Sequence, residues 1–312
     1  MKITRTKDFN LIERFLSENF SSPTHWPEWN QIISKYYNTD FYYIVLENKG
    51  TISGICPIHG EENRVLNLLY SGQFNYIPYG GWIFKNNEIV DKKHFPLKYN
   101  QILTGFSLPT GGNFPNYSMK LKSTLFSTLT IDLDHDENWI WENCIDSKRR
   151  NMIRKAQKNQ VFVDEVTLEN YSTFYAFYTE SNTRYNLTCL AKDCLAELLF
   201  STKSIKFHAT LVKYENKIIS SHVMVSDKNI ALYWMGLNAV LIPNLGQGEL
   251  LQWMAIKNAK KFGCKFYDLC YIEKERLPKI HEFKKGFSQN ESQIVNFCVK
   301  PLSYRIINRI QK

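Results

Sequence analysis

The hydrophobic positions of this chain alternate between helical and strand-like spacing. Large apolar residues recur every three or four positions within the first 20 residues, and Asp8 precedes them as an N-cap, so we expect a helix there. A second helix is expected after Pro27. The apolar and β-branched runs 41–46 and 51–58 flank a short polar turn, which predicts a β-hairpin.

The same alternation continues into the middle of the chain. Residues 64–69 and 81–84 are expected to pair as strands, and residues 127–133 to form a further strand. An acidic stretch follows this strand and marks a candidate domain boundary. From Glu137 to about residue 159 the spacing predicts one long helix.

The second half of the sequence repeats the first half in a shorter form. The turn Glu215-Asn216-Lys217 repeats Glu47-Asn48-Lys49, and each follows an apolar strand, which hints at two similar domains. We expect an α/β (α+β) protein with one domain over 1–136 and a second over 137–295, with 296–312 packing back on the first. The elements expected in the second half are helices 168–182 and 249–262, strands 207–214, 218–225, 230–236, 266–269 and 293–299, and an amphipathic helix after Pro301.

The composition is that of a globular protein. With 44% hydrophobic and 22% charged residues over 312 positions, the chain can bury a sizeable core, which excludes intrinsic disorder over most of its length. No run approaches the ~20 apolar residues that a membrane-spanning helix needs. The N-terminus carries no apolar signal segment. We therefore expect a cytoplasmic location, with the inner face of the membrane as an alternative.

Charge and metal-binding residue types narrow the range of partners. The formal net charge of +9 favours anionic partners such as small anionic or nucleotide-linked substrates, nucleic acid or an anionic membrane surface. The seven cysteines contain no C-x-x-C pair, and the seven histidines contain no H-x-x-x-H group. We therefore expect reduced thiols and no metal site.

Two segments have features typical of anion binding. Gly246-Gln247-Gly248 opens a predicted helix, where free N–H groups and the positive end of the helix dipole suit a pyrophosphate or an oxyanion. The basic stretch Lys148–Lys158 places Arg150, Arg154 and Lys158 on one helix face at i, i+4 and i+8. The ordinary alternative is a solvated surface, and both interpretations of this face stay open.

Several segments together resemble the FemABX family and its GNAT-like relatives. Residues 148–161, KRRNMIRKAQKNQV, are similar to the K-x-R-x-x-I-R-K-A-x-K-x-G-V block of that family, with Gln160 at the glycine position. Residues 263–269, GCKFYDL, resemble its G-x-x-x-x-D strand, and residues 283–287, FKKGF, resemble its F-K-x-x-F motif. Tyr79-Gly80-Gly81 adds a match in the first half. The resemblance implies two tandem GNAT-like domains, without the coiled-coil arm of some members.

The resemblance also assigns roles to individual residues. It implies that Lys284 stabilises negative charge at the acyl centre and that Phe283 shapes the acyl channel. It implies that Arg184 contacts a phosphate or a carboxylate. Tyr79 joins Arg150 and Arg154 among the substrate-binding candidates. In the GNAT relatives, the loop that corresponds to Gly246, Gln247 and Gly248 holds the phosphates of the cofactor.

Three further residues are candidates because of their places on predicted strands. Asp268 stands at the C-terminal end of a strand, where it can receive a proton from an amine or serve as a structural carboxylate. Tyr233 can donate a hydrogen bond into a cleft or be a buried aromatic residue. For His222, a hydrogen-bonded core or edge histidine is a simpler interpretation than a general base.

These inferences together predict an acyltransferase. It would move an activated acyl group from acyl-CoA or a similar thioester to an amine of a cell-envelope sugar or peptide precursor, by direct attack and without a permanently bound cofactor. Aminoacyl-tRNA is the alternative donor, so tRNA and a membrane-linked precursor stay open as partners. An alternative of another class is a non-catalytic RNA or nucleotide-sugar binding protein that uses the basic helix.

Overall fold

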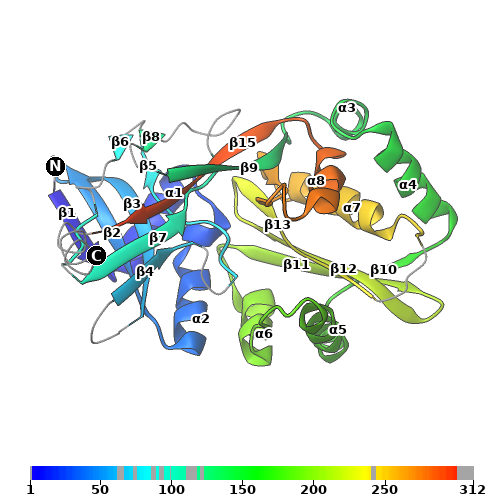
Figure 1. Ribbon diagram of the computed structural model, residues 1–312, viewed down its shortest axis with the longest axis horizontal. Helices are drawn as coiled ribbons and strands as arrows, with labels where there is room; N and C mark the ends of the chain where they lie inside the picture. The colour runs from blue at the N-terminus through cyan, green and yellow to red at the C-terminus, as the bar shows by residue number, and fades with distance from the viewer. Residues whose placement is uncertain are drawn as a thin grey trace, which may run out of the picture. The chain divides into compact units, whose positions relative to one another are not determined.

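The computed structural model describes residues 2–61, 67–72, 76–85, 89–90, 95–98, 100–109, 118–119, 123–239 and 244–300 (Figure 1). The chain divides into two compact units. Unit 1 comprises Met1–Thr128 together with Ser292–Lys312, and unit 2 comprises Leu129–Glu291. The sequence placed these boundaries a few residues later, after 136 and after 295.

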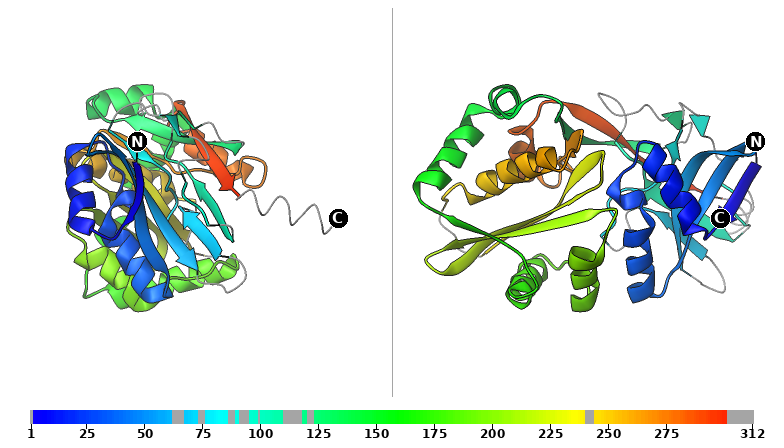
Figure 2. Two further views of the ribbon diagram at one scale, coloured as in Figure 1. Left: turned by 90° about the vertical axis from the view of Figure 1, so that its left-hand side faces the viewer. Right: turned by 180° about the vertical axis from the view of Figure 1, so that it is seen from behind.

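Unit 1 is built on one mixed sheet whose strands follow the order β1-β2-β3-β4-β7-β15. A short strand, β5, pairs with β3, and two more, β6 and β8, pair with each other. The helices α1 and α2 lie side by side on the sheet (Figure 2). The elements are β1 (Lys2–Thr6), α1 (Phe9–Glu18), the 3-10 turn η1 (Pro23–His25), α2 (Pro27–Tyr37), β2 (Asp40–Asn48), β3 (Thr51–Glu61), β4 (Asn67–Ser71), β5 (Ile83–Phe84), β6 (Ile89–Val90), β7 (Gln101–Phe106), β8 (Ser118–Met119) and β15 (Glu291–Val299).

Unit 2 has a second mixed sheet in the order β9-β14-β13-β12-β11-β10. Helices α5 and α6 lie on one face of this sheet, and α7 with α4 lies on the other (Figure 1). The elements are β9 (Ser123–Asp132), α3 (Glu137–Asn143), α4 (Ser147–Lys158), β10 (Phe162–Glu165), α5 (Tyr171–Arg184), α6 (Lys192–Ser201), β11 (Lys206–Tyr214), β12 (Lys217–Ser226), β13 (Ile230–Asn238), α7 (Gln247–Lys261), β14 (Phe266–Asp268) and α8 (Pro278–Lys285).

The two sheets correspond strand by strand. In unit 1 three antiparallel pairings lead from β1 to β4, β4 pairs with β7 in parallel, and β7 pairs with β15 antiparallel. Unit 2 repeats this sequence of directions from β10 through β13 to β14 and β9. The two units therefore share one sheet topology, and this agrees with the duplication that the repeated turn predicted.

The hairpins β2–β3 and β11–β12 are equivalent in the two units. Both predicted turns are present, but the residues that correspond between them differ from those that the sequence match paired. Lys49 and Gly50 connect β2 to β3 with positive φ, and Glu215 and Asn216 connect β11 to β12 in the same conformation. This conformation suits the right-handed twist of a hairpin. Each pair of strands has a register shift close to its turn, at Leu46/Glu47 and at Val212/Lys213. The equivalent turn residues are thus two positions away from those that the letters Glu-Asn-Lys suggested.

Most of the expected elements are confirmed, and three expectations are wrong. Asp8 caps α1 by accepting a hydrogen bond from the Leu11 N–H group, as predicted, but residues 2–6 form β1 before it. The expected pair of 64–69 with 81–84 does not form, because β5 pairs with β3 and β4 lies between β3 and β7. The expected long helix from Glu137 is two helices, because Asp146 caps a new one at α4. The predicted helix after Pro301 lies outside the described residues.

One hydrophobic core of unit 2 lies between its sheet and α7. Its members are apolar residues of β9, β12, β13, β14, α3, α4, α7 and the segments next to them, with Phe287 after α8. Apolar residues of α5 and α6 are buried as well. In the described part of the chain no helix is both long enough and apolar enough to cross a membrane.

Candidate active site

The candidate site lies where two parallel strands of unit 2 stop pairing. β13 and β14 pair from Ile230 with Phe266 to Leu232 with Asp268, and β13 then continues alone to Asn238 on this side. Just beyond the last pair, the Lys284 ammonium group donates hydrogen bonds to the carbonyl oxygens of Cys270 at 3.0 Å and Tyr271 at 3.4 Å. The same ammonium lies 5.5 Å from the centre of the Tyr233 ring. Lys284 therefore contacts β13 and the segment that follows β14, just beyond the point where the two strands separate.

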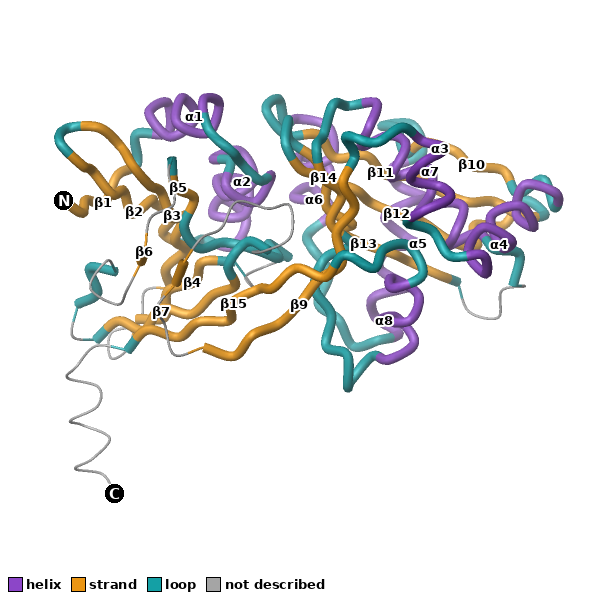
Figure 3. The backbone as a smooth tube through the Cα atoms, turned by 90° about the horizontal axis from the view of Figure 1, so that it is seen from above, coloured by secondary structure: helices purple, strands orange, loops and turns teal. Residues whose placement is uncertain are grey.

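Lys284 comes from α8, which lies beside β13 in the view from above (Figure 3). Its side chain points inward, and only 7% of the residue is exposed. Burial lowers the pKa of the Lys284 amine, while the nearby Cys270 and Asp268 oppose this effect. Because two carbonyl oxygens and an aromatic ring surround it, the nitrogen is placed among groups that favour its protonated form.

Asp268 fixes the turn that supplies these carbonyl groups. It is fully buried at the end of β14, and its Oδ1 atom accepts a hydrogen bond of 2.8 Å from the Cys270 N–H group. Cys270 has φ = 58°, a conformation that non-glycine residues seldom adopt. The side chain of Asp268 thus stabilises an unusual turn beneath Lys284. This contact matches the structural interpretation of Asp268, and its proton-accepting role stays a prediction.

A buried polar cluster that sequence analysis did not assemble lies behind Tyr233. The His222 ring stacks on the Tyr233 ring with centres 4.7 Å apart and planes 2° apart. The Tyr267 hydroxyl lies 3.3 Å from His222 Nε2 and accepts a hydrogen bond of 2.6 Å from Gln252. Burial lowers the pKa of His222 to about 3, with His208 adding to the effect, so this imidazole is neutral. His222 is therefore a hydrogen-bonded core histidine, as predicted.

The cluster could not be assembled from the sequence because its members are far apart along the chain. His222 lies on β12, Tyr233 on β13, Tyr267 on β14 and Gln252 on α7. A bulge at Trp234 and the absence of a side chain at Gly236 allow the Tyr233 side chain to lie over the strand. A Cβ atom at Gly236 would lie 1.9 Å from the Tyr233 hydroxyl oxygen. The glycine is the one local signal of this arrangement.

Arg149 holds α8 in place through a buried ion pair. Its guanidinium group donates to the Glu249 carboxylate at 2.9 Å and to the Glu282 carbonyl oxygen at 3.2 Å, and it lies 5.0 Å from the Phe283 ring centre. The pair therefore joins α4, α7 and α8. Gly286 permits this approach, since a Cβ atom there would lie 2.5 Å from Arg149 Nε. In the sequence Arg149 is one of several basic residues in Lys148–Lys158, and no pattern there indicates this role.

The basic helix α4 uses several of its charges within the fold. Arg150 donates to the carbonyl oxygens of Trp141, Glu142 and Ile145, which are left without helical partners at and after the end of α3. Arg154 is exposed and contacts Asn151 and the Trp141 ring. The Arg150 side chain therefore has a structural role, because it binds the free carbonyl oxygens at the end of α3. Substrate contacts of Arg150 and Arg154 stay predictions.

The glycine loop before α7 is packed against its neighbours. Gly246 is the N-cap of α7 with φ = 81°, and a Cβ atom there would lie 2.1 Å from the Met152 carbonyl oxygen. Gln247 is buried and accepts a hydrogen bond from the Leu245 N–H group. Gly248 faces Phe283 of α8. Close packing thus explains Gly246, and phosphate binding at this loop stays a prediction.

The remaining candidates lie elsewhere. Arg184, at the end of α5, donates to the Asn238 carbonyl oxygen at 3.0 Å. Phe283 is half-buried between Arg149 and Gly248, beside the buried Phe287. Tyr79 belongs to unit 1 and is fully buried there. The structure therefore brings together Lys284, Asp268 and Tyr233.

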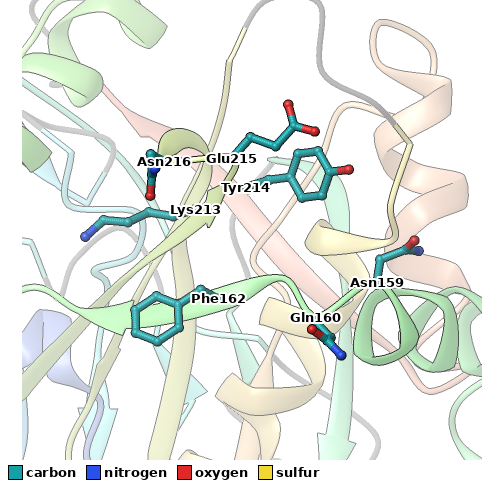
Figure 4. Close-up of a pocket in the computed structure, with 7 residues that line it drawn as sticks. All are labelled: Asn159, Gln160, Phe162, Lys213, Tyr214, Glu215 and Asn216. Carbon is teal, nitrogen blue, oxygen red and sulfur yellow. The ribbon is translucent and has the colours of Figure 1, made fainter.

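An open pocket of about 460 Å³ lies at the other end of the unit 2 sheet and contains none of the candidates (Figure 4). Phe162 and Lys213 point away from Asn159 and Gln160, so its side chains do not converge. Gln160 has φ = 50° at the position where the related motif has glycine. Within the described ranges, no three histidine, cysteine or acidic side chains are grouped as metal ligands. All seven cysteines are free thiols.

Comparison with known proteins shows similarity in structure but not in sequence. No protein-family model and no curated protein matches the chain. Among solved structures, FemX superposes over 100% of both chains with a TM-score of 0.68 at 11% identity. L-PGS from Bacillus licheniformis aligns over 96% of this chain and 94% of its own, with a TM-score of 0.53 at 11% identity. A tandem GNAT protein from the clavulanic acid biosynthesis pathway aligns over 96% and 99%, with a TM-score of 0.50 at 8% identity.

These similarities extend over both units, and they agree with the strand-by-strand correspondence of the two sheets. The chain therefore has a FemX-like fold of two tandem GNAT-like domains, as its sequence motifs predicted.

Proposed function

We propose that the protein is an acyltransferase that joins an activated acyl or aminoacyl group to an amine. The observation that carries the proposal is the buried ammonium group of Lys284 at the point where β13 and β14 separate. A cation that is held in place in a water-poor environment stabilises a developing negative charge more strongly than one in bulk water. The FemX-like fold supports the same class of reaction.

In the proposed reaction the acceptor amine attacks the carbonyl carbon of a thioester or ester. A C–N bond forms, the carbonyl oxygen gains negative charge, and the bond to the sulfur or oxygen of the leaving group then breaks. The proton that the amine loses passes to the leaving group. Lys284 stabilises the oxyanion by exchanging its longer hydrogen bond, to the Tyr271 carbonyl oxygen, for one to the substrate. Asp268 keeps the Cys270 turn, and with it Lys284, in place.

The proposed acceptor is an amine on a sugar or peptide precursor of the cell envelope, and two donors are considered. A coenzyme A thioester would place its phosphates at the Gly246–Gly248 loop, which in this structure is packed between α4 and α8. An aminoacyl-tRNA would need a broad cationic surface, to which the exposed Arg154 and Lys158 would contribute.

The test offers both donors to the wild-type protein and to two lysine variants. The donors are radiolabelled acetyl-CoA and tRNA charged with radiolabelled amino acids, each with amino sugars and envelope peptide precursors as acceptors. Lys284→Met is expected to lower transfer at least 100-fold, since removing a charge that stabilises an oxyanion has effects of this size. Lys285→Met changes the neighbouring exposed lysine and is the matched control. Transfer by Lys284→Met at the control rate would refute the proposal.

A non-catalytic RNA or nucleotide-sugar binding protein is the alternative, and it makes the opposite prediction. Binding would then survive Lys284→Met and be strongly weakened by charge reversal at Arg154, and the remaining binding would depend less on the salt concentration. Arg154 is the more informative position because Arg150 is bonded to three carbonyl groups of the fold, so that its reversal also disturbs the end of α3.

A further inference from the structure

The buried cluster behind Lys284 is built around the face of one aromatic ring. Tyr233 carries the His222 ring in a parallel stack and also contacts the Lys284 ammonium group. The Tyr233 ring therefore forms one side of the place that the ammonium occupies, and the carbonyl oxygens of Cys270 and Tyr271 form another. At Tyr233 the strand β13 pairs with β12 but no longer with β14, so neighbouring side chains contribute to the position of this ring.

We propose that His222 is a positioning residue, which holds the Tyr233 ring in the place where Lys284 contacts it. The inference rests on the proposed acyl transfer for its functional meaning, but its geometry is independent of the donor and the acceptor. His222 does not touch the reacting atoms. It acts through Tyr233, and Tyr267 in turn holds His222.

A histidine serves this purpose better than an apolar residue because it is anchored at its edge. His222 is 4% exposed, and its Nε2 atom lies 3.3 Å from the Tyr267 hydroxyl. Since Gln252 donates to the Tyr267 oxygen, the hydroxyl hydrogen is available for His222, and Nε2 is then the acceptor. This hydrogen bond fixes both the tautomer and the rotation of the imidazole ring. A leucine at this place would fill space without defining a plane.

The neutral state of His222 is part of the arrangement. The ionisable groups around Lys284 are Asp268 and Cys270 near the end of β14, Tyr233 on β13 and His281 on α8. Tyr267 on β14 faces Tyr233, and His208 on β11 acts on His222. A charged imidazole stacked on Tyr233 would place a second cation in the same buried cluster as the ammonium. Burial lowers the pKa of His222 to about 3 and raises that of Tyr233 to about 12, so both rings are uncharged near neutral pH.

The experiment measures the titration of Lys284 directly, by NMR of protein labelled with ¹³C at the lysine Cε atoms. Lys284→Arg assigns the signal. In His222→Leu the flat ring is lost, so Tyr233 gains freedom and water reaches the ammonium. Loss of the contact with the Tyr233 ring lowers the midpoint, but burial is the larger influence on the pKa of this amine, so the entry of water outweighs that loss. We therefore expect the titration midpoint of Lys284 to move upward, by about half a pH unit or more, toward that of exposed lysines, and a downward shift would overturn the proposal. In His222→Phe the flat ring is kept, and the midpoint is expected to change by less than about 0.2 units.

Tyr267→Phe gives a second measurement if His222→Leu does not fold. It removes the hydroxyl group that anchors His222 with little change in volume. We expect the titration midpoint of Lys284 to move upward by less than in His222→Leu, because the imidazole ring is still present. An unchanged Lys284 midpoint in either His222→Leu or Tyr267→Phe would overturn the proposal. So would equal shifts in His222→Leu and His222→Phe, because the flat ring would then be irrelevant. The acyl-transfer assay of Lys284→Met fails or succeeds separately from this titration.

Discussion

Acidification from pH 7.5 to pH 5.5 is expected to destabilise the fold through three buried histidines. His25 and His59 lie in unit 1, and His222 lies in unit 2. His25 Nε2 contacts the Gly81 carbonyl oxygen at 3.1 Å, and His59 Nε2 contacts Asn30 Oδ1 at 2.9 Å. Burial lowers the pKa of His25 to about 4 and the pKa values of His59 and His222 to about 3. In the unfolded chain each has its ordinary value of 6.5.

The sign of the effect follows from these pKa values. Because the folded pKa lies below the unfolded one, the unfolded chain binds more protons, and stability falls as the pH drops below 6.5. The stabilisation is complete above pH 6.5 and is lost progressively toward the folded pKa values. Between pH 7.5 and pH 5.5 each histidine costs about 1.3 kcal/mol of unfolding free energy, and the three together cost about 4 kcal/mol.

Urea denaturation followed by circular dichroism at the two pH values measures this loss. Ordinary carboxyl groups titrate below this range, so they contribute little to the difference. His59→Gln is expected to reduce the pH dependence by about one third, since one of the three histidines is gone. His135→Gln, which changes an exposed histidine, controls for the substitution itself. Equal stability at pH 7.5 and pH 5.5 would contradict the inference that these imidazoles are buried in the neutral form.

Two further predictions concern buried charge and close packing. Arg149→Met leaves the Glu249 carboxylate buried without its partner, and we expect it to lower the free energy of unfolding in urea by about 3 to 5 kcal/mol. Lys148→Met removes an exposed ion pair and should lower it by less than about 1 kcal/mol. Gly80→Ala would place a Cβ atom 2.1 Å from the Ser71 carbonyl carbon, so we expect a loss of about 3 kcal/mol or no folding of unit 1, while Gly248→Ala has room and should be tolerated. Equal stabilities within either pair of variants would show that the assigned contacts do not contribute.

Local patterns were sufficient to predict the elements that carry their own signals. Caps and turns were predictable because their residue types favour the conformations that are observed. Examples are Asp8 before α1, Lys49-Gly50 between β2 and β3, and Gly263 after α7. β10 and α6 were missed because the first has only four residues and the apolar positions of the second follow no clear stripe. The break before α4 was predictable, since Asp146 is a capping residue, but the residue types on both sides of it are common in helices and suggested one continuous helix.

The sequence named Lys284, Asp268 and Tyr233 as separate candidates, each from its own segment, and only the structure shows that they lie together. The partners that determine the environment of Lys284 come from other elements, and no spacing in the sequence relates His222 or Tyr267 to α8. The role of Arg149 could not be predicted from the sequence either. Its charge suggested an anionic ligand, but the anion it meets is Glu249, a residue of the same fold one hundred positions away.

The equivalent place in unit 1 explains why the proposed chemistry is assigned to unit 2. There the parallel pair β4–β7 ends at Ser71 and Gly105. Just beyond it the backbone of Tyr79–Gly81 bonds to both strands. The Gly80 N–H group donates to the Phe106 carbonyl oxygen at 2.7 Å, and the Gly81 N–H group donates to Ser71 Oγ at 2.8 Å. The gap between the strands is therefore filled by main chain.

The Tyr79–Gly81 main chain in unit 1 and the Lys284 side chain in unit 2 are held in different ways. The Tyr79–Gly81 segment is held by its own backbone hydrogen bonds and by glycine contacts that leave no room for a Cβ atom, so it can leave the gap only if unit 1 opens locally. The Lys284 ammonium group is held by two side-chain hydrogen bonds, and these can be exchanged while the strands keep their places. If the ammonium group gives up its 3.4 Å hydrogen bond to Tyr271 and keeps the 3.0 Å bond to Cys270, it stays in place and has one N–H group for the carbonyl oxygen of the proposed substrate. Unit 2 thus has a side-chain cation at the place where unit 1 has main chain, and for this reason we assign the proposed acyl transfer to unit 2.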